Sequence, residues 1–287
     1  MLAWGIPDNR YLRRRGVDVM EYTEKDHVFA VCAYKESVYL EACIDSLEKQ
    51  DVLGRIIVCT ATPNDYISGI AARHGLPLFI NNGPHGIAED WNFAYAQADA
   101  PLVTLAHQDD VYEPNYLKRM LTALNAEKKP LIGFSDYYEL RNGEKSFARH
   151  NKNLKIKETI MMPLRVARLQ KSRWVRRRIL SLCDPICCPA VTYVKENLPA
   201  VVFETDFKCD LDWRAWEKLS RLKGSYCYVH EPLMGHRIHH ESTTTEIIGE
   251  HNGRSSEDLE IYRKFWPLPV AKLLNRMYSG AQKSNNI

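Results

Sequence analysis

The first 140 residues alternate between short apolar segments of strand length and longer segments with helical spacing. Strand-like apolar runs occur at 28–33, 55–60, 76–80, 102–106 and 131–140. Apolar residues recur at helical spacing in 38–50, 64–74, 87–98 and 116–127. Strands that alternate with helices of this length are typical of a parallel sheet with crossover helices. The sequence therefore predicts an α/β fold.

The second half of the chain follows this alternation less regularly. Strands are predicted at 190–194 and 225–229, with a helix at 212–222 between them. The segment 249–254 has the composition of a loop or linker, and the tail from Ser255 is helical in character. The prediction for this half is an irregular region followed by a helical C-terminal appendage.

Composition excludes several classes of protein. The net charge of the 287 residues is only +3, which gives no reason to expect a nucleic-acid partner. Residues 1–28 lack the apolar core of a signal peptide, and no apolar run reaches the length of a membrane span. None of the eight cysteines forms a C-x-x-C pair, so a zinc site is not expected. We therefore expect a cytoplasmic protein with reduced cysteines.

Two adjacent carboxylates, Asp109 and Asp110, follow the apolar run 101–106 directly. In α/β sheets, ligands bind at the carboxyl ends of the strands. Of two such acids, one can hold a hard divalent cation while the other accepts a hydrogen bond from a sugar hydroxyl. The alternative is that both are solvated acids at the start of a turn.

Four ordered segments resemble the motifs of inverting family 2 glycosyltransferases of the GT-A fold. They are residues 28–37, 56–65, 86–92 and 109–110. The first loop departs from the usual motif, since 33–37 lacks its proline and asparagine, and Thr60 stands where the family usually has aspartate. The resemblance spans about 27–243. It implies a GT-A-like, mostly parallel sheet flanked by helices.

This resemblance also implies domain limits and donor-site residues. The limits are an N-terminal extension at 1–26, a GT-A domain at 27–245 and a helical C-terminal segment at 246–287. The implied nucleotide-sugar contacts are Ala33, Tyr34, Glu36, Thr60, Thr62, Asp65, Asn92, Asp109 and Arg237. Asp110 and His239 are the implied ligands of Mn²⁺ or Mg²⁺. Turn and helix-cap chemistry is the alternative for the segment 62–65 and for Asn92.

Family members place their catalytic base in an acidic cluster before a helix. Here Asp210 matches that base best, and Asp212 is the second candidate. The structural alternatives are a helix N-cap for Asp210 and a first-turn acid for Asp212. Trp213 and Trp216 follow these acids closely in the sequence and could stack on the faces of a sugar, but we expect them in the core.

The implied function is that of a metal-dependent inverting glycosyltransferase. It would move a sugar from a nucleotide-diphosphate donor, expected to be a UDP-sugar, to a saccharide or lipid-linked acceptor in surface polysaccharide synthesis. Two alternatives stay open. One is a non-catalytic GT-A-like module that binds a partner through 165–178. The other is a nucleotidyltransferase, although the first loop lacks the glycines such enzymes usually carry.

A basic segment at 165–178 carries seven cations and no acid, and we predict one helix over 164–180. A solvated face is one interpretation of it. An anionic membrane surface is another, favoured by Trp174 among the arginines, and nucleic acid is a distant third. The second interpretation would make the protein peripheral at the inner face of the membrane. The tail segment 264–276 would then be a further membrane contact, or it packs on the domain.

Overall fold

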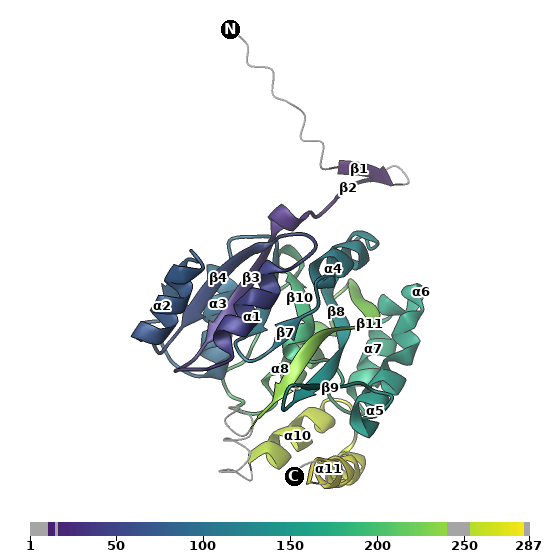
Figure 1. Ribbon diagram of the computed structural model, residues 1–287. Helices are drawn as coiled ribbons and strands as arrows, with labels where there is room; N and C mark the ends of the chain where they lie inside the picture. Colours follow the sequence, from purple (N-terminus) through teal and green to yellow (C-terminus); the bar gives the residue numbers. More distant parts are fainter. Residues whose placement is uncertain (1–10, 15–16, 240–252, 284–287) are drawn as a thin grey trace.

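The computed structural model describes residues 11–14, 17–239 and 253–283 (Figure 1). The expected domain limit at 245/246 and most of the predicted loop 249–254 therefore lie outside the described residues. Tyr11–Arg14 (β1) and Val17–Met20 (β2) pair as an antiparallel hairpin. None of the helices in the described ranges is long and apolar enough to cross a membrane.

A single large sheet organises the chain, with the strand order β5-β4-β3-β6-β10-β8-β11-β7 and β9 paired to β8. Its strands are β3 (His27–Ala33), β4 (Arg55–Thr60), β5 (Leu78–Ile80), β6 (Leu102–His107), β7 (Val111–Tyr112), β8 (Pro130–Arg141), β9 (Glu144–Ser146), β10 (Val191–Val194) and β11 (Ser225–Ile238). β7, β9 and β10 run against the other strands. The predicted α/β fold with a mostly parallel sheet is confirmed.

Helices flank this sheet (Figure 1). They are α1 (Leu40–Glu48), α2 (Asp65–Arg73), α3 (Ile87–Gln97), α4 (Tyr116–Asn125), α5 (Lys152–Met161), α6 (Ala167–Gln170), α7 (Arg173–Leu180), α8 (Leu211–Leu219), α10 (Gly253–Arg263) and α11 (Leu268–Lys283). Short 3-10 turns lie at η1 (Glu24–Asp26), η2 (Met162–Arg165), η3 (Cys188–Ala190) and η4 (Lys195–Asn197). In the regular first half, the predicted elements differ from these bounds only at their ends.

Strand β3 shows why the apolar runs are continuous rather than alternating. Val28 and Ala30 pack into one core with Trp213, whereas Phe29 and Val31 pack into a second core on the opposite face. Because successive strand residues point to opposite faces, a strand covered on both faces needs apolar residues throughout. Trp213 and Trp216 are fully buried, which confirms the expected core role.

Two predictions about the second half are wrong. The predicted helix 164–180 is broken into η2, α6 and α7. The basic run is also not wholly exposed, because Arg176 is 1% exposed and donates to the carbonyls of Ser220 (2.8 Å) and Gly224 (2.7 Å). Arginine capping of the carbonyls that follow α8 explains why this side chain turns inward.

The second error concerns the end of the strand predicted at 225–229. The predicted strand 225–229 instead continues as β11 to Ile238, paired with β8 along its length and with β7 near its end. Backbone pairing with β8 holds 236–238 in extended form, and β7 pairs with the two residues just before them, Met234 and Gly235.

Candidate active site

The candidate site lies at one edge of the sheet, where several strands end. β3, β4 and β6 are parallel neighbours, so their carboxyl ends meet there. Asp109 and Asp110 follow the end of β6, as predicted. Strand β11 is parallel to β8 and brings Arg237 to the same place, 127 residues away in sequence from Asp110.

Asp110 is fully buried at this edge. Its Oδ1 accepts a hydrogen bond from the backbone N–H of Arg237 (2.9 Å) and lies 3.2 Å from Nδ1 of His236. Burial acts to lower the pKa of His236, but the Asp110 carboxylate outweighs it and raises that pKa. The other oxygen of Asp110, Oδ2, has no hydrogen-bond partner among the described residues.

At the same edge, Asp109 contacts both Arg237 and His239. Its Oδ2 lies 3.0 Å from Nε2 of His239, and its backbone carbonyl accepts from Nε of Arg237 (2.8 Å). The Arg237 guanidinium stacks over the ring of Tyr39 at 4.3 Å, and His239 lies against the same ring. The structure therefore brings together four of the predicted site residues: Asp109, Asp110, Arg237 and His239.

The first loop, residues 33–37, is held by hydrogen bonds from its backbone to the side chains of Gln108 and Thr62. Gln108 makes two hydrogen bonds of 2.9 Å with the backbone N–H and carbonyl of Tyr34. Thr62 accepts from the backbone N–H of Lys35 at 2.6 Å, and Lys35 itself adopts a left-handed φ of 52°. Left-handed backbone in a residue other than glycine is strained and persists only where contacts hold it.

The remaining predicted donor residues fall into two groups. Ala33 and Thr60 are buried at the ends of β3 and β4, next to this loop. Glu36 and Asp65 are exposed. The capping alternative for 62–65 is confirmed, because Asn64 caps α2 by accepting from the N–H of Ile67 (2.8 Å).

The side chain of Asn92 forms hydrogen bonds with the backbone of the segment before α8. Its Nδ2 donates to the carbonyl of Phe203 (2.7 Å), and its Oδ1 accepts from the backbone N–H groups of Val202 and Phe203. The side chain thus fastens the segment before α8 to α3. Close by, Trp91 stacks on His107 at 4.8 Å. Burial lowers the pKa of His107 to about 4, so this imidazole is neutral near pH 7.

The two candidate bases, two residues apart, have different surroundings. Asp210 is 3% exposed and lies under α10. Glu257 of α10 accepts from the backbone N–H groups of Lys208, Cys209 and Asp210 at 2.8–3.0 Å. Burial, followed by the neighbouring carboxyl of Asp258, raises the pKa of Asp210 well above its usual value.

Asp212 is only partly buried, and its Oδ1 accepts from the N–H of Trp213 (2.8 Å). Its carboxylate affects the pKa values of His107 and Cys187. The acids of the strand edge affect the same two groups, Asp109 acting on His107 and Asp110 on Cys187. Burial and the Asp212 carboxylate raise the pKa of Asp184 well above its usual value. Asp212, unlike Asp210, therefore lies near the candidate site.

Lys157 of α5 approaches the same region and donates to the Tyr137 hydroxyl (3.1 Å). Burial acts to lower the pKa of Lys157, but Tyr137, Tyr278 and Asp184 together outweigh it, and the pKa stays above its ordinary value. Sequence reasoning missed Gln108, Tyr39, Asp184 and Lys157. Only Gln108 carried a sequence signal, since it stands between a strand end and two acids.

A metal could be held in two places within the described ranges. Asp45, Glu48 and His74 bring their ligand atoms within 4.8 Å of one another, but they lie in the C-terminal half of α1 and just after α2. The strand edge instead faces the N-terminal end of α1, where Tyr39 lies. At that edge, the unpartnered Oδ2 of Asp110 fits a divalent cation, because buried carboxylate oxygens need a donor or a metal.

Comparison with known proteins gives one family. A family model described as Glycosyl transferase family 2 matches residues 28–181, more than half of the chain. No curated protein matches the chain by sequence.

Several solved structures share the fold. S. aureus TarS 1-349 in complex with UDP-GlcNAc has a TM-score of 0.55 at 14% identity, covering 91% of this chain and 73% of that one. The mannosyltransferase PcManGT from Pyrobaculum calidifontis, in complex with GDP-Man and Mn²⁺, has a TM-score of 0.57 at 14% identity, covering 91% and 76%. Glucosyl-3-phosphoglycerate synthase from Mycobacterium tuberculosis, with Mn²⁺, UDP and phosphoglyceric acid, gives 0.51 at 17% identity, covering 85% and 80%. At these identities the likeness extends to the GT-A fold alone.

Proposed function

The chain belongs to glycosyl transferase family 2, and from this premise we propose that it moves a sugar from a nucleotide-diphosphate donor to an acceptor hydroxyl, with inversion at the anomeric carbon. One observation carries the proposal. The carboxylate of Asp110 is fully buried at the carboxyl edge of the sheet, and one of its oxygens has no partner among the described residues. Such an oxygen, beside Arg237 and His239, suits a cation that accompanies a diphosphate.

The donor we propose is a UDP-sugar, with its nucleoside at the first loop. Three features support this placement: the loop backbone is fastened by Gln108 and Thr62, Thr60 ends the next strand, and Asp109 lies where a ribose hydroxyl can donate to it. Two of the structures of the same fold contain UDP or UDP-GlcNAc, and another contains GDP-Man. The identity of the donor's nucleobase is therefore the part of this proposal to test first.

For the diphosphate we propose Arg237, with Asp110 and His239 as the residues that hold Mn²⁺ or Mg²⁺. The bound cation would neutralise charge on the leaving diphosphate as a Lewis acid. Arg237 is oriented for its part by two contacts, with the Asp109 carbonyl and with the Tyr39 ring. A guanidinium has further N–H donors in a planar fork that matches phosphate oxygens.

As catalytic base we propose Asp212 rather than Asp210. A general base must reach the acceptor hydroxyl and be ionised near neutral pH. Asp210 is buried beneath α10 and its raised pKa favours the protonated form. Asp212 is partly exposed on the side of His107, and the adjacent Asp184, with its own raised pKa, is placed to share a proton with it.

The acceptor we propose is a saccharide or a lipid-linked saccharide in surface-glycan synthesis, and the proposed setting is the cytoplasm. All eight cysteines are free, which supports a reducing compartment.

Thermal unfolding tests the donor proposal directly. The protein is heated with UDP, GDP and a panel of their sugars, with and without Mn²⁺. A ligand at about a hundred times its dissociation constant adds about 2.7 kcal/mol to the free energy of unfolding. We expect a Mn²⁺-dependent rise in Tm with UDP and with one UDP-sugar, followed by transfer that inverts the anomeric centre in the NMR spectrum. Equal shifts with and without metal, or none with any nucleotide, would contradict the proposal.

A further inference from the structure

Exposed apolar side chains gather on two neighbouring parts of the molecule. Eight of the fourteen exposed large apolar residues in the described ranges lie either between α5 and α7 or on α11. The first group is Ile156, Met162, Val166 and Trp174. The second group is Leu268, Val270, Leu273 and Met277. We call the exposed residues of 152–174 and 268–277 together the basic–apolar face.

The two parts of this face adjoin. Figure 1 shows α5 directly above α11 at one corner of the molecule. Tyr278 on α11 lies close enough to Lys157 of α5 to affect its pKa, which agrees with this placement of the two helices. The segment from η2 to α7 continues from α5 along the same side of the molecule (Figure 1).

Helix α11 is apolar on two sides. Its inner side packs on the domain through Tyr278, 5.5 Å from the Trp213 ring, and through the buried Ala271. Its outer side carries Val270, Leu273 and Met277 at helical spacing, with Leu273 59% and Met277 65% exposed. Packing against the fold accounts for the inner side only.

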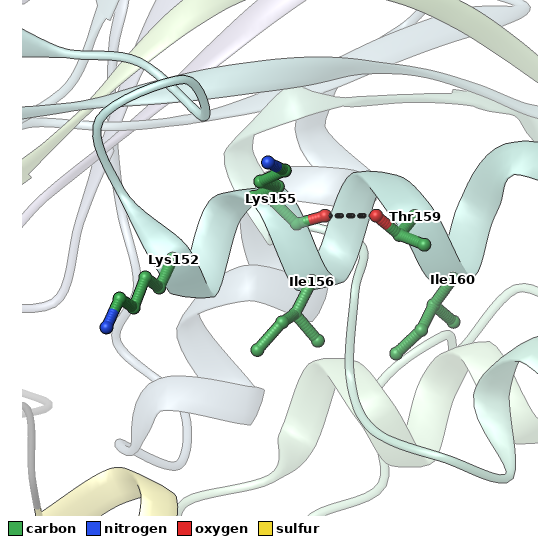
Figure 2. Close-up of a pocket in the computed structure, with 5 residues that line it drawn as sticks. All are labelled: Lys152, Lys155, Ile156, Thr159 and Ile160. Atoms are coloured by element: carbon green, nitrogen blue, oxygen red, sulfur yellow. Dashed lines mark hydrogen bonds between the residues drawn. The ribbon is translucent and has the colours of Figure 1, made fainter.

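Helix α5 also turns an apolar strip outward. A cavity of about 420 Å³ lies along it, lined by Lys152, Lys155, Ile156, Thr159 and Ile160 (Figure 2). Figure 2 shows Ile156 and Ile160 pointing to the same side of the helix. The two lysines border this strip, so the surface combines apolar side chains with cations.

Cations predominate around these residues, and Glu158 is the one acid in 152–174. Residues 159–183 and 264–287 contain no aspartate or glutamate. Arg176 is buried, Arg177 pairs with Glu217 and Arg178 lies over Trp266. These three arginines therefore make contacts within the fold and are not counted as part of the face. The cations left on the face are exposed and have no ion pair within the described chain: Lys152, Lys155, Arg165, Arg168, Arg173, Lys272 and Arg276.

We propose that the basic–apolar face seats the protein on an anionic lipid bilayer. Cations attract anionic headgroups, while leucine, methionine, isoleucine and tryptophan side chains enter the interface between headgroups and acyl chains. A second copy of the chain fits less well, because a two-fold interface would set like charges against each other. A nucleic acid would bind the cations but make no use of the apolar stripe.

Vesicle co-sedimentation tests this proposal without any nucleotide sugar, so its outcome is independent of the transfer reaction. The full chain is mixed with vesicles of phosphatidylcholine alone, or of phosphatidylcholine and phosphatidylglycerol in equal parts. We expect binding to the anionic vesicles only, weakened by salt because exposed charges are screened.

Two double variants then divide the face. L273E with M277E removes the apolar stripe, and we expect binding to fall at least about tenfold. K272E with R276E reverses two cations, and we expect a fall of about thirtyfold or more, since each basic residue near an anionic surface contributes roughly a fivefold factor. L53E with V201E is the matched control, because it puts two glutamates on exposed apolar positions outside the face and should leave binding unchanged. Circular dichroism checks that each variant is folded.

Four outcomes would overturn the proposal. The first is equal binding of the wild-type chain to neutral and anionic vesicles, or to neither. The second is an unchanged affinity in both face variants, or an equal loss in the control. The third is a wild-type dimer in sedimentation velocity that L273E with M277E dissociates, which would assign the face to a second copy. Retention of a short duplex DNA in place of vesicles would assign it to nucleic acid.

Discussion

The strand edge and the junction of α8 with α10 each bury an aspartate, and they differ in what surrounds the carboxylate. At the strand edge, fully buried Asp110 accepts a hydrogen bond from the backbone N–H of Arg237 and lies 3.2 Å from Nδ1 of His236. At the α8–α10 junction, Asp210 is buried almost as completely but lies beside a second carboxyl, Asp258. A second carboxyl next to a buried aspartate favours its protonated form, whereas hydrogen-bond donors favour the charged form.

The junction of α8 with α10 stabilises the start of a helix, which the strand edge does not do. Glu257 accepts three consecutive backbone N–H groups just before and at the start of α8. Arg254 lies 3.5 Å from Asp210 and partly offsets the acids. Helix α10 therefore closes the N-terminus of α8, and Asp210 lies in this junction. The following predictions test this division, from the largest expected effect to the smallest.

Asp110→Asn should abolish most transfer. The substitution keeps the shape of the side chain but removes the charge that would hold a cation, and we expect kcat/KM to fall by about a thousandfold. The Mn²⁺-dependent rise of Tm with UDP should vanish as well. Asp45→Asn, in the other cluster of potential ligands, is the control and should change neither quantity. Activity lost in the control but kept in Asp110→Asn would move the metal site to α1 and α2.

Asp212→Asn should lower kcat by at least about a hundredfold, the usual contribution of general-base catalysis. Asp210→Asn should stay within about threefold of wild type, because asparagine resembles the protonated acid that a raised pKa favours. Initial rates at saturating donor measure both. A reversed order of the two variants would assign the base to Asp210 and contradict the division between edge and junction.

Asp258→Asn should stabilise the protein above pH 6. Burial raises the pKa of Asp258 from 3.8 to about 6, so the folded state binds a proton that the unfolded state has lost. Stability from this group is full below pH 4 and is lost as pH rises through 6. Two pKa units correspond to about 3 kcal/mol at most.

Urea unfolding at pH 4 and pH 8 measures this effect. The variant should match wild type at pH 4 and exceed it at pH 8. Glu260→Gln, on the same helix but exposed, should show no such pH dependence. A variant that is less stable than wild type at pH 8 would mean that Asp258 is ionised and needed there.

Gln108→Ala should raise the KM for the donor about three- to tenfold with little change in kcat. It removes two hydrogen bonds to the Tyr34 backbone, each contributing about 1 kcal/mol. Gln108→Glu keeps the acceptor for the Tyr34 N–H and loses the donor to its carbonyl, so it should fall between alanine and wild type. Steady-state kinetics at varied donor concentration separate the two constants, and an effect on kcat alone would place Gln108 in the chemical step.

Local pattern predicted the first half well because each element there is specified by its own residues. The run 55–60 is β4 without any change of bounds, and Gly75 follows α2 with a left-handed φ of 63°. β11 was predicted too short, because its last residues are held by pairing with β8 and β7 rather than by apolar composition. The basic run was predicted as one helix because sequence does not show that Arg176 caps carbonyls beyond α8.

The sequence by itself determined the α/β alternation and the position of Asp109 and Asp110 at a strand end, and it supplied the two acids from which we propose a base. These follow from periodicity and from residue type, which are local properties. Only the tertiary structure gave Asp210 and Asp212 different surroundings, on which our proposal of Asp212 as the base rests; the two lie about 200° apart around a helix of 3.6 residues per turn. It was α10, more than forty residues further along the chain, that covered one of these acids and left the other on the side of His107.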